Sequence, residues 1–224
     1  MIKFYFHPTP NPMKVALFLN EADLEFELIP VDTRKGEQHT PEYRAINPNG
    51  KTPAIIDGDQ CVFDSNAILL YLADKTGRFG GRPSDRGEIL SWLMFIASGL
   101  GPFSGQSVHF RSAAPEGLDY AANRYFREAQ RHYEVLDQQL NGRQYIVGDD
   151  YSIVDMAAWG WIDRVERVLG EGALMQYPNI ERWFNSVNQR PAVARARQTG
   201  EGIAFKSDLD EQAKRALFPS NYPK

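Results

Sequence analysis

One glycine- and proline-rich stretch, residues 77–83, separates two parts of this 224-residue chain that differ in hydrophobic pattern. Before the stretch, short β-branched and aromatic runs alternate with helical periodicity, whereas the residues after it show helical periodicity almost throughout. This change of pattern favours two domains. We predict an α/β domain over residues 1–77, a linker over 78–84, an all-helical domain over 85–200 and a peripheral C-terminal tail over 201–224.

The first part has the pattern of a strand–helix–strand unit followed by a short helix, a hairpin and a closing helix. A strand–helix–strand unit favours parallel pairing of its two strands, and Pro30 suggests that the second strand lies at an edge. A turn centred on Gly58 joins the hairpin strands. The predicted strands are 2–6, 24–28, 54–56 and 61–63, and the predicted helices are 13–22, 41–46 and 67–75.

Polar residues mark where helices begin and end. Asn11 before Pro12, and Ser65 before a helical run, are typical of helix N-termini, and Gly77 is typical of a C-terminus. Capping boxes are expected at residues 85–88 and 152–155. After about residue 200 the sequence is polar and interrupted by proline, with one short helix predicted near 211–217.

The charge and cysteine content exclude several classes of protein. With 29 acidic and 25 basic residues the formal net charge is −4, whereas duplex-binding proteins normally carry a basic excess. Cys61 is the single cysteine, which excludes an internal disulfide and a cysteine-rich metal site. No apolar run approaches the roughly 20 residues of a membrane crossing, and the first residues enter a strand pattern without a signal peptide. We expect a cytoplasmic protein without nucleic-acid or membrane partners.

Three motifs stand at characteristic places: Asn-Gly-Lys-Thr-Pro-Ala (49–54), Asp-Ser-Asn-Ala-Ile-Leu-Leu-Tyr (64–71) and Ser-Ile-Val-Asp (152–155). Together they resemble the glutathione transferase family over about residues 1–205. The segments Tyr-Phe-His-Pro-Thr-Pro-Asn (5–11), Lys-Gly-Glu-Gln (35–38) and Gly-Leu-Gly-Pro (99–102) look most like the bacterial nu class, which are glutathione-dependent disulfide-bond oxidoreductases. The resemblance implies a thioredoxin-like, glutathione-binding domain of βαβ-α-ββα order, followed by an all-α domain.

Redox relatives of this fold carry a nucleophilic cysteine before a proline, in the loop after the first strand. Here the pattern contains Thr9 and Pro10, which excludes a protein thiol at this position. The resemblance implies that Thr9 and Asn11, with free amides at a helix N-terminus, stabilise the thiolate of bound glutathione and lower its pKa from about 8.5. The alternative is a rigid loop with an ordinary N-cap.

The same resemblance implies further residues that hold glutathione. Ser65 and Asp64 match positions for the γ-glutamyl carboxylate and ammonium, and the Thr52–Pro53 pair matches a cis-proline turn beside the cysteinyl part. Gln38 and Arg124 match contacts from a loop and from the helical domain. The alternatives are an N-cap for Ser65, a trans bond before Pro53 and solvated positions for Gln38 and Arg124.

Four other side chains receive no catalytic role. Tyr5 lies in the first predicted strand and is assigned to packing. Cys61 is expected on the second hairpin strand as an inert, partly buried thiol. His7 and His109 border the expected pocket for the second substrate, but neither has a metal-ligand partner at a useful spacing.

Thiol–disulfide exchange by bound glutathione is the predicted reaction, with no metal and no permanently bound cofactor. The expected substrates are reduced or oxidised glutathione and a small disulfide, and a homodimer is expected from the resemblance. Two alternatives stay open at this point. One is conjugation of glutathione to a carbon electrophile, and the other is non-catalytic binding of glutathione or another ligand.

Overall fold

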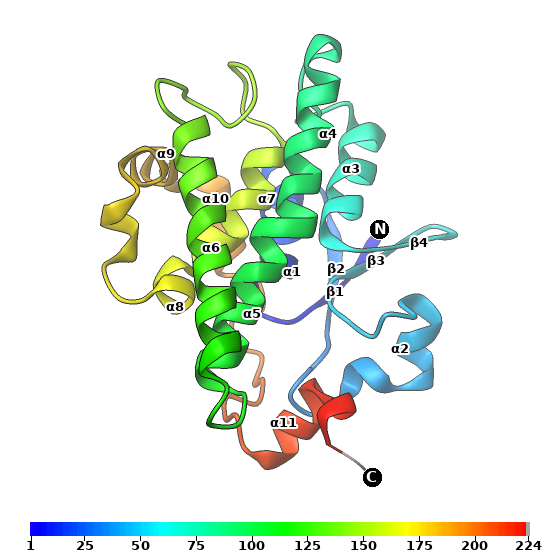
Figure 1. The fold of residues 1–224 in the computed structure, drawn as a ribbon. Coiled ribbons are helices and arrows are strands. Elements are labelled where there is room, and N and C mark those ends of the chain that lie inside the picture. The colour runs from blue at the N-terminus through cyan, green and yellow to red at the C-terminus, as the bar shows by residue number, and fades with distance from the viewer. Residues whose placement is uncertain (223–224) are drawn as a thin grey trace.

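The computed structural model describes residues 1–222, in which a small mixed sheet is joined to a larger array of helices (Figure 1). Among the helices of this range, none combines the length and the apolar composition that a membrane crossing requires. In chain order the strands and α-helices are β1 (Ile2–Phe6), α1 (Pro10–Glu21), β2 (Phe26–Pro30), α2 (Pro41–Ile46), β3 (Ala54–Asp57), β4 (Gln60–Phe63), α3 (Ser65–Thr76), α4 (Arg86–Phe95), α5 (Gly101–Ser112), α6 (Asp119–Gln139), α7 (Ile153–Ile162), α8 (Val165–Leu169), α9 (Pro178–Asn188), α10 (Pro191–Arg197) and α11 (Glu211–Leu217).

The strands form one sheet in the order β2-β1-β3-β4. β1 and β2 run parallel, with Ile2 opposite Phe26 and Phe6 opposite Pro30. β3 pairs antiparallel with β1, and β4 pairs antiparallel with β3. The expected fold class is confirmed: a thioredoxin-like domain of βαβ-α-ββα order precedes an all-helical domain. The second strand does lie at an edge, although it begins two residues later than predicted because residues 24 and 25 lead into it from the turn after α1.

Two helix N-termini differ from the sequence prediction. α1 begins at Pro10 with Thr9 at the N-cap position, so Asn11 lies inside the first turn and is not the cap. The fixed φ of Pro10 suits a first helical position, which explains the earlier start. α3 begins at Ser65, and its cap is Asp64, whose Oδ1 accepts hydrogen bonds from the amides of Asn66 (2.9 Å) and Ala67 (3.2 Å).

Only one of the two predicted capping boxes forms. The carboxylate of Asp85 accepts from Arg82 Nε and from the Ser84 hydroxyl, both at 2.9 Å, instead of capping α4. The box that opens α7 is confirmed, because the Ser152 hydroxyl accepts from Val154 N and Asp155 Oδ2 accepts from Ser152 N. The guanidinium of Arg82 thus binds the half-buried carboxylate of Asp85, whereas no guanidinium contacts the buried carboxylate of Asp155 among the described residues.

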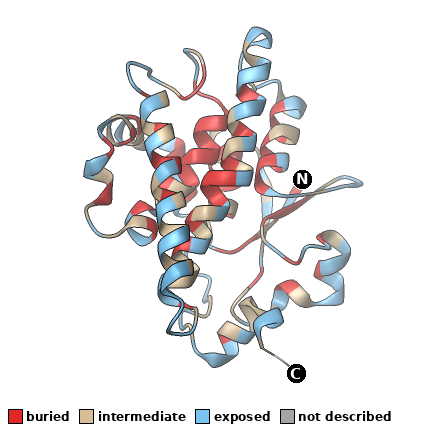
Figure 2. Ribbon diagram, in the orientation of Figure 1, coloured by how far each residue is buried: buried red, intermediate tan, exposed pale blue. Residues whose placement is uncertain are grey.

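The two domains share one core in which α1 of the first domain packs against α7 and α10 of the second. Figure 2 shows buried residues gathered along α7 and the helices facing it. The closest approach is at Gly160, where a Cβ would lie 2.6 Å from the carbonyl oxygen of Pro10 and 2.7 Å from Lys14 Cγ. α7 therefore lies directly against the first turns of α1.

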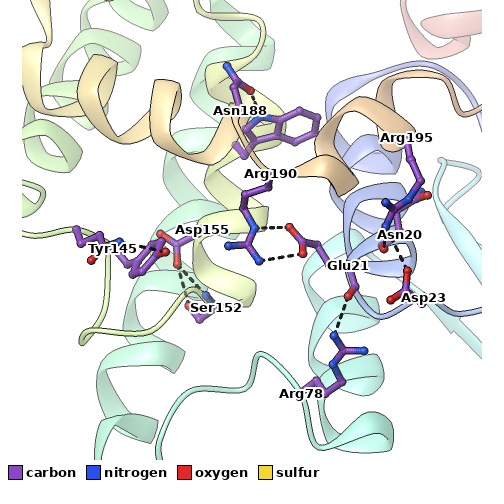
Figure 3. A network of polar contacts seen from close by, with 12 residues as sticks. Asn20, Glu21, Asp23, Arg78, Tyr145, Ser152, Asp155, Asn188, Arg190 and Arg195 are labelled. Atoms are coloured by element: carbon purple, nitrogen blue, oxygen red, sulfur yellow. Dashed lines mark hydrogen bonds and ion pairs between the residues drawn. The ribbon is translucent and has the colours of Figure 1, made fainter.

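A polar network holds the other end of α1 (Figure 3). Arg190, between α9 and α10, makes a two-point contact with the carboxylate of Glu21, with Nη2 2.9 Å from Oε2. Its guanidinium also lies 3.9 Å from the ring centroid of Tyr151. Arg195 donates to the carbonyl of Asn20 at 2.6 Å. Both ends of α1 are thus held by the helical domain.

The C-terminal tail packs against the surface of the sheet domain in the described range. Figure 1 shows it returning to the sheet domain, where α11 lies near the segment that leads to α2. The ring of Phe205 packs 4.9 Å from that of His7, and the amide of Lys206 donates to Asp32 Oδ2 at 2.7 Å. The predicted helix at 211–217 is confirmed as α11. Burial of the Phe205 ring stabilises this return.

Candidate functional site

Two adjoining cavities meet at the N-terminal end of α1. Their volumes are about 470 Å³ and about 330 Å³. Trp161 and Gly105 line both cavities, so the two spaces share a wall. Thr9 faces the larger cavity and Asn11 faces the smaller one. The start of a single helix therefore contributes a polar side chain to each space.

The donors at this helix start are fewer than the sequence suggested. Thr9 N–H donates to the His7 carbonyl at 2.7 Å, and the Thr9 hydroxyl lies 3.5 Å from the same oxygen, at the limit of a hydrogen bond. Pro10 and Pro12 have no amide hydrogen, so Asn11 supplies the one N–H of the first three helical positions. The candidate donors to a ligand are the Thr9 hydroxyl and the backbone and side-chain amides of Asn11.

The N-terminus of α3 forms one side of the smaller cavity, which is lined by Asp64, Ser65 and Asn66. Asp64 has a φ of 69°, a conformation that costs a non-glycine residue about 1–3 kcal/mol and occurs often at ligand sites. Asn66 is 3% exposed, and its Oδ1 accepts no hydrogen bond within residues 1–222. The structure thus brings two predicted residues, Asp64 and Ser65, to the same cavity as Asn11.

Lys14 also lines the smaller cavity, and the sequence analysis missed it. The residue is 1% exposed, and its Nζ donates to Ser65 Oγ at 3.4 Å. Burial lowers the pKa of Lys14 to about 7, and the carboxylate of Asp64 opposes part of that shift. The available signal was a single lysine within the apolar run of α1, where a charged residue is costly unless it is used.

Trp161 is a second residue that the sequence analysis missed. A Cβ at Gly101 would lie 2.9 Å from Trp161 Nε1, and one at Gly105 would lie 3.6 Å from the far edge of the indole. The indole N–H is buried and has no partner within residues 1–222. The available signal in the sequence was the pair of glycines at 101 and 105, because they leave the space that the indole occupies.

The larger cavity has a basic lining. Arg34, Arg164, Arg167 and Lys206 line it, together with the ring of His7. Burial lowers the pKa of His7, a shift that the carboxylate of Asp32 partly opposes. The other expected histidine, His109, lies outside both cavities and packs 4.4 Å from the ring of Phe218. Four cationic side chains around one space favour an anionic occupant.

Sequence comparison places these features in a known family. Residues 1–74 match the family pattern "Glutathione S-transferase, N-terminal domain", and residues 102–191 match "Glutathione S-transferase, C-terminal domain". The chain belongs to the glutathione S-transferase family. Its members are enzymes, and this protein is an enzyme of that family.

Two curated relatives come from Escherichia coli K12. The chain is 43% identical over 204 residues to "Disulfide-bond oxidoreductase YfcG". This alignment covers 88% of this chain and 94% of the relative. The chain is 37% identical over 217 residues to "Disulfide-bond oxidoreductase YghU". This second alignment covers 88% of this chain and 74% of the relative. Both relatives are named for disulfide chemistry.

Two solved structures share the fold. A glutathione transferase from Burkholderia graminis, with two glutathione molecules per subunit, has a TM-score of 0.82 at 36% identity and covers 90% of this chain and 89% of its own. A glutathione transferase from Pseudomonas putida, with one glutathione disulfide per subunit, has a TM-score of 0.82 at 33% identity and covers 88% of this chain and 90% of its own.

The structure of this glutathione S-transferase does not bring Gln38 or Arg124 to either cavity. Gln38 is 1% exposed, and its Nε2 donates to the carbonyls of Thr33 and Ala216, each at 3.1 Å. The solvated alternative for Gln38 is wrong, because the returning tail covers this residue. Arg124 projects from α6 with a 59% exposed side chain, 3.9 Å from Glu128.

The remaining predicted positions lie in the sheet domain. The Thr52–Pro53 bond is cis, as the family resemblance implied, and the pairing of Tyr5 with Ala54 places Pro53 beside the end of β1. Cys61 lies on β4 as predicted but is exposed, not partly buried, because β4 is the edge strand. Cys61 lines neither cavity.

Proposed function

We propose that this protein is a nu-class, glutathione-dependent disulfide-bond oxidoreductase that uses the thiolate of bound glutathione and no protein cysteine. The observation that carries the proposal is that Thr9 and Asn11, two residues apart at one helix start, face two adjoining cavities. One cavity suits the glutathione that attacks and the other suits the disulfide that is attacked. The names of the two Escherichia coli relatives, and the two glutathione molecules per subunit in the Burkholderia structure, support this division.

Glutathione occupies the smaller cavity in this proposal, with its thiol at the boundary between the cavities. Donation from Thr9 and Asn11 stabilises the thiolate over the thiol and lowers its pKa. The thiolate attacks one sulfur of a disulfide in the larger cavity, forming a mixed disulfide and releasing the other sulfur as a thiolate that takes up a proton. A second glutathione then resolves the mixed disulfide. Two glutathione molecules are oxidised to glutathione disulfide while the substrate disulfide is reduced to two thiols.

Conjugation to a carbon electrophile is the competing reaction, and the basic lining of the larger cavity favours the disulfide of an anionic thiol over an apolar aromatic compound. Turnover with a mixed disulfide of glutathione and with a chloronitrobenzene is the test. We expect the first to react much faster. Turnover with the chloronitrobenzene alone contradicts the proposal, and absence of binding to reduced and oxidised glutathione by calorimetry favours a different role for the fold.

A homodimer and a cytoplasmic location complete the proposal. The homodimer derives from the family resemblance, and the cytoplasmic location derives from the cysteine content of the sequence. The exposed apolar side chains of Phe63 on β4 and Met94 on α4 are consistent with a covered face between two copies. Sedimentation of the purified chain tests the dimer. A single species at the mass of one chain contradicts it.

Replacing Asn11 with alanine is expected to lower kcat/KM for disulfide reduction by about 10- to 100-fold, since a hydrogen bond to a charged group contributes roughly 1.5–3 kcal/mol. The free energy of unfolding should change little, because Asn11 is not the cap of α1. Steady-state kinetics and urea unfolding measure the two effects. Equal losses of activity and stability contradict a role in the thiolate site.

Replacing Cys61 with serine is expected to leave kcat/KM unchanged within about twofold, because the thiol is exposed on β4 and lines neither cavity. The same disulfide assay measures the effect. Loss of activity in a folded Cys61→Ser protein means that the protein supplies its own sulfur and overturns the mechanism.

A further inference from the structure

The side chain of Lys14 lines the smaller cavity, and its amine has no close anionic partner there. A fully buried ammonium group normally requires a close anionic partner, because its removal from water is costly. In this structure its Nζ has one hydrogen bond, of 3.4 Å, to the neutral hydroxyl of Ser65. The residue is also held in place, since Gly160 of α7 lies against its side chain. The site therefore contains an amine that is held in place but has no anionic partner to stabilise its charged form.

The groups that face Lys14 come from several elements. α3 contributes Ser65 and Asn66, its N-cap residue is Asp64, and α7 contributes Trp161. The π-helical turn at 96–100 and α5 contribute only uncharged residues to this cavity. Among the described residues that line the cavity, Lys14 and Asp64 are the only charged ones.

Acceptors without partners stand opposite this cation. Asp64 uses Oδ1 to cap α3, which leaves Oδ2 available, and Asn66 Oδ1 accepts no hydrogen bond within residues 1–222. A simple anion such as phosphate would satisfy Lys14 but would lie against the carboxylate of Asp64. A group with a carboxylate and an ammonium on one carbon satisfies both sides.

The family resemblance already implies a γ-glutamyl head group beside Asp64 and Ser65. We propose that Lys14 is the counter-charge for the α-carboxylate of that head group in the smaller cavity, and that Asn66 is a further acceptor for its α-ammonium. The Ser65 hydroxyl and the N-terminus of α3 contact the same carboxylate, so the anion lies between two positive ends. This inference rests on the proposed function in one respect only, which is that glutathione is the ligand.

Proton uptake on binding follows from this arrangement. Without ligand the pKa of Lys14 is about 7, so at pH 8 the amine is mostly neutral. A carboxylate placed beside it favours the charged form and raises that pKa, and the amine then takes a proton from solution. At pH 6 the amine is already charged and no proton is needed.

Calorimetry with S-methylglutathione tests the proposal, because this ligand keeps the γ-glutamyl head but has no thiol that releases a proton. Titrations at pH 8 in HEPES and in Tris, whose ionisation enthalpies differ, give the number of protons taken up. We expect Lys14→Met to take up about 0.5–1 proton fewer per ligand than the wild type at pH 8, with no difference at pH 6. Any uptake by the α-ammonium of the ligand is common to both proteins and cancels.

The affinity of Lys14→Met for S-methylglutathione at pH 6 should be lower by about tenfold or more. Lys3→Met is the matched control, because Lys3 is exposed on β1 and should change neither affinity nor proton count. Binding with equal proton uptake in the wild type and Lys14→Met at pH 8 overturns the role of Lys14 alone. Absence of any binding by the wild type overturns the proposed function together with this inference.

Discussion

Replacing Asp155 with alanine is expected to lower the free energy of unfolding by about 3–5 kcal/mol, the range for breaking a buried charged network. The carboxylate is fully buried at the start of α7, where Figure 3 shows it beside Ser152, and it accepts four hydrogen bonds. The donors are the amides of Ile146 and Ser152, the hydroxyl of Ser152 and the indole N–H of Trp183, at 2.8–3.2 Å. Alanine leaves all four donors without their acceptor.

Urea unfolding followed by far-UV circular dichroism measures this loss. Asp150→Ala is the matched control, because Asp150 is an exposed aspartate five residues earlier, in the loop before α7. We expect the control to change stability by less than about 0.5 kcal/mol. Similar stabilities for the two variants contradict the role of Asp155 as the centre of this network.

Lys14→Met is expected to be more stable than the wild type below pH 7, by about 3–5 kcal/mol, with the difference shrinking as the pH rises toward 10. The pKa of Lys14 is about 7 in the folded protein and 10.5 in the unfolded chain. Between these values the unfolded chain binds more protons at this residue, so the stability of the wild type rises with pH across that window. Methionine fills the same space without a charge and removes this contribution.

Urea unfolding of both proteins at pH 6, 8 and 9.5 measures the effect. The difference between the proteins carries the information, because other groups titrate equally in both. Lys3→Met should follow the wild type at each pH, since Lys3 is exposed. A constant difference between Lys14→Met and the wild type at all three values contradicts a buried amine that titrates near neutral pH.

Lys14→Met is therefore expected to have opposite effects at low pH: it raises the stability of the folded protein and weakens the binding of the ligand. The same buried amine that destabilises the folded protein at low pH binds the carboxylate of the ligand in our proposal. Residues that are costly for folding and useful for binding are common at functional sites. Saturation with S-methylglutathione should therefore stabilise the wild type more than Lys14→Met at pH 6.

Local sequence patterns determined most of the secondary structure and the fold class. Residues 2–6 and 54–56 are short β-branched, aromatic or apolar runs of strand length. Each run is followed by residues that end strands, such as the prolines after β1 and Gly58 after β3. β1 and β3 were therefore predictable from the sequence. The capping box at Ser152 and Asp155 was equally local, because both partners lie within one helical turn. The motifs that contain Thr9, Asn11 and Ser65 led, by resemblance, to the region where the two cavities lie.

Tertiary packing decided which polar groups share the site. Lys14 faces the smaller cavity because α7 lies against α1 at Gly160, and Trp161 reaches it because α5 has glycine at 101 and 105. Gln38 is covered because residues from 205 onward return to the sheet domain. Periodicity and capping depend on residues within a few positions of each other, so the sequence alone determined the elements. Contacts between residues such as Lys14 and Ser65, or Gln38 and Ala216, depend on how those elements pack, and only the tertiary structure decided them.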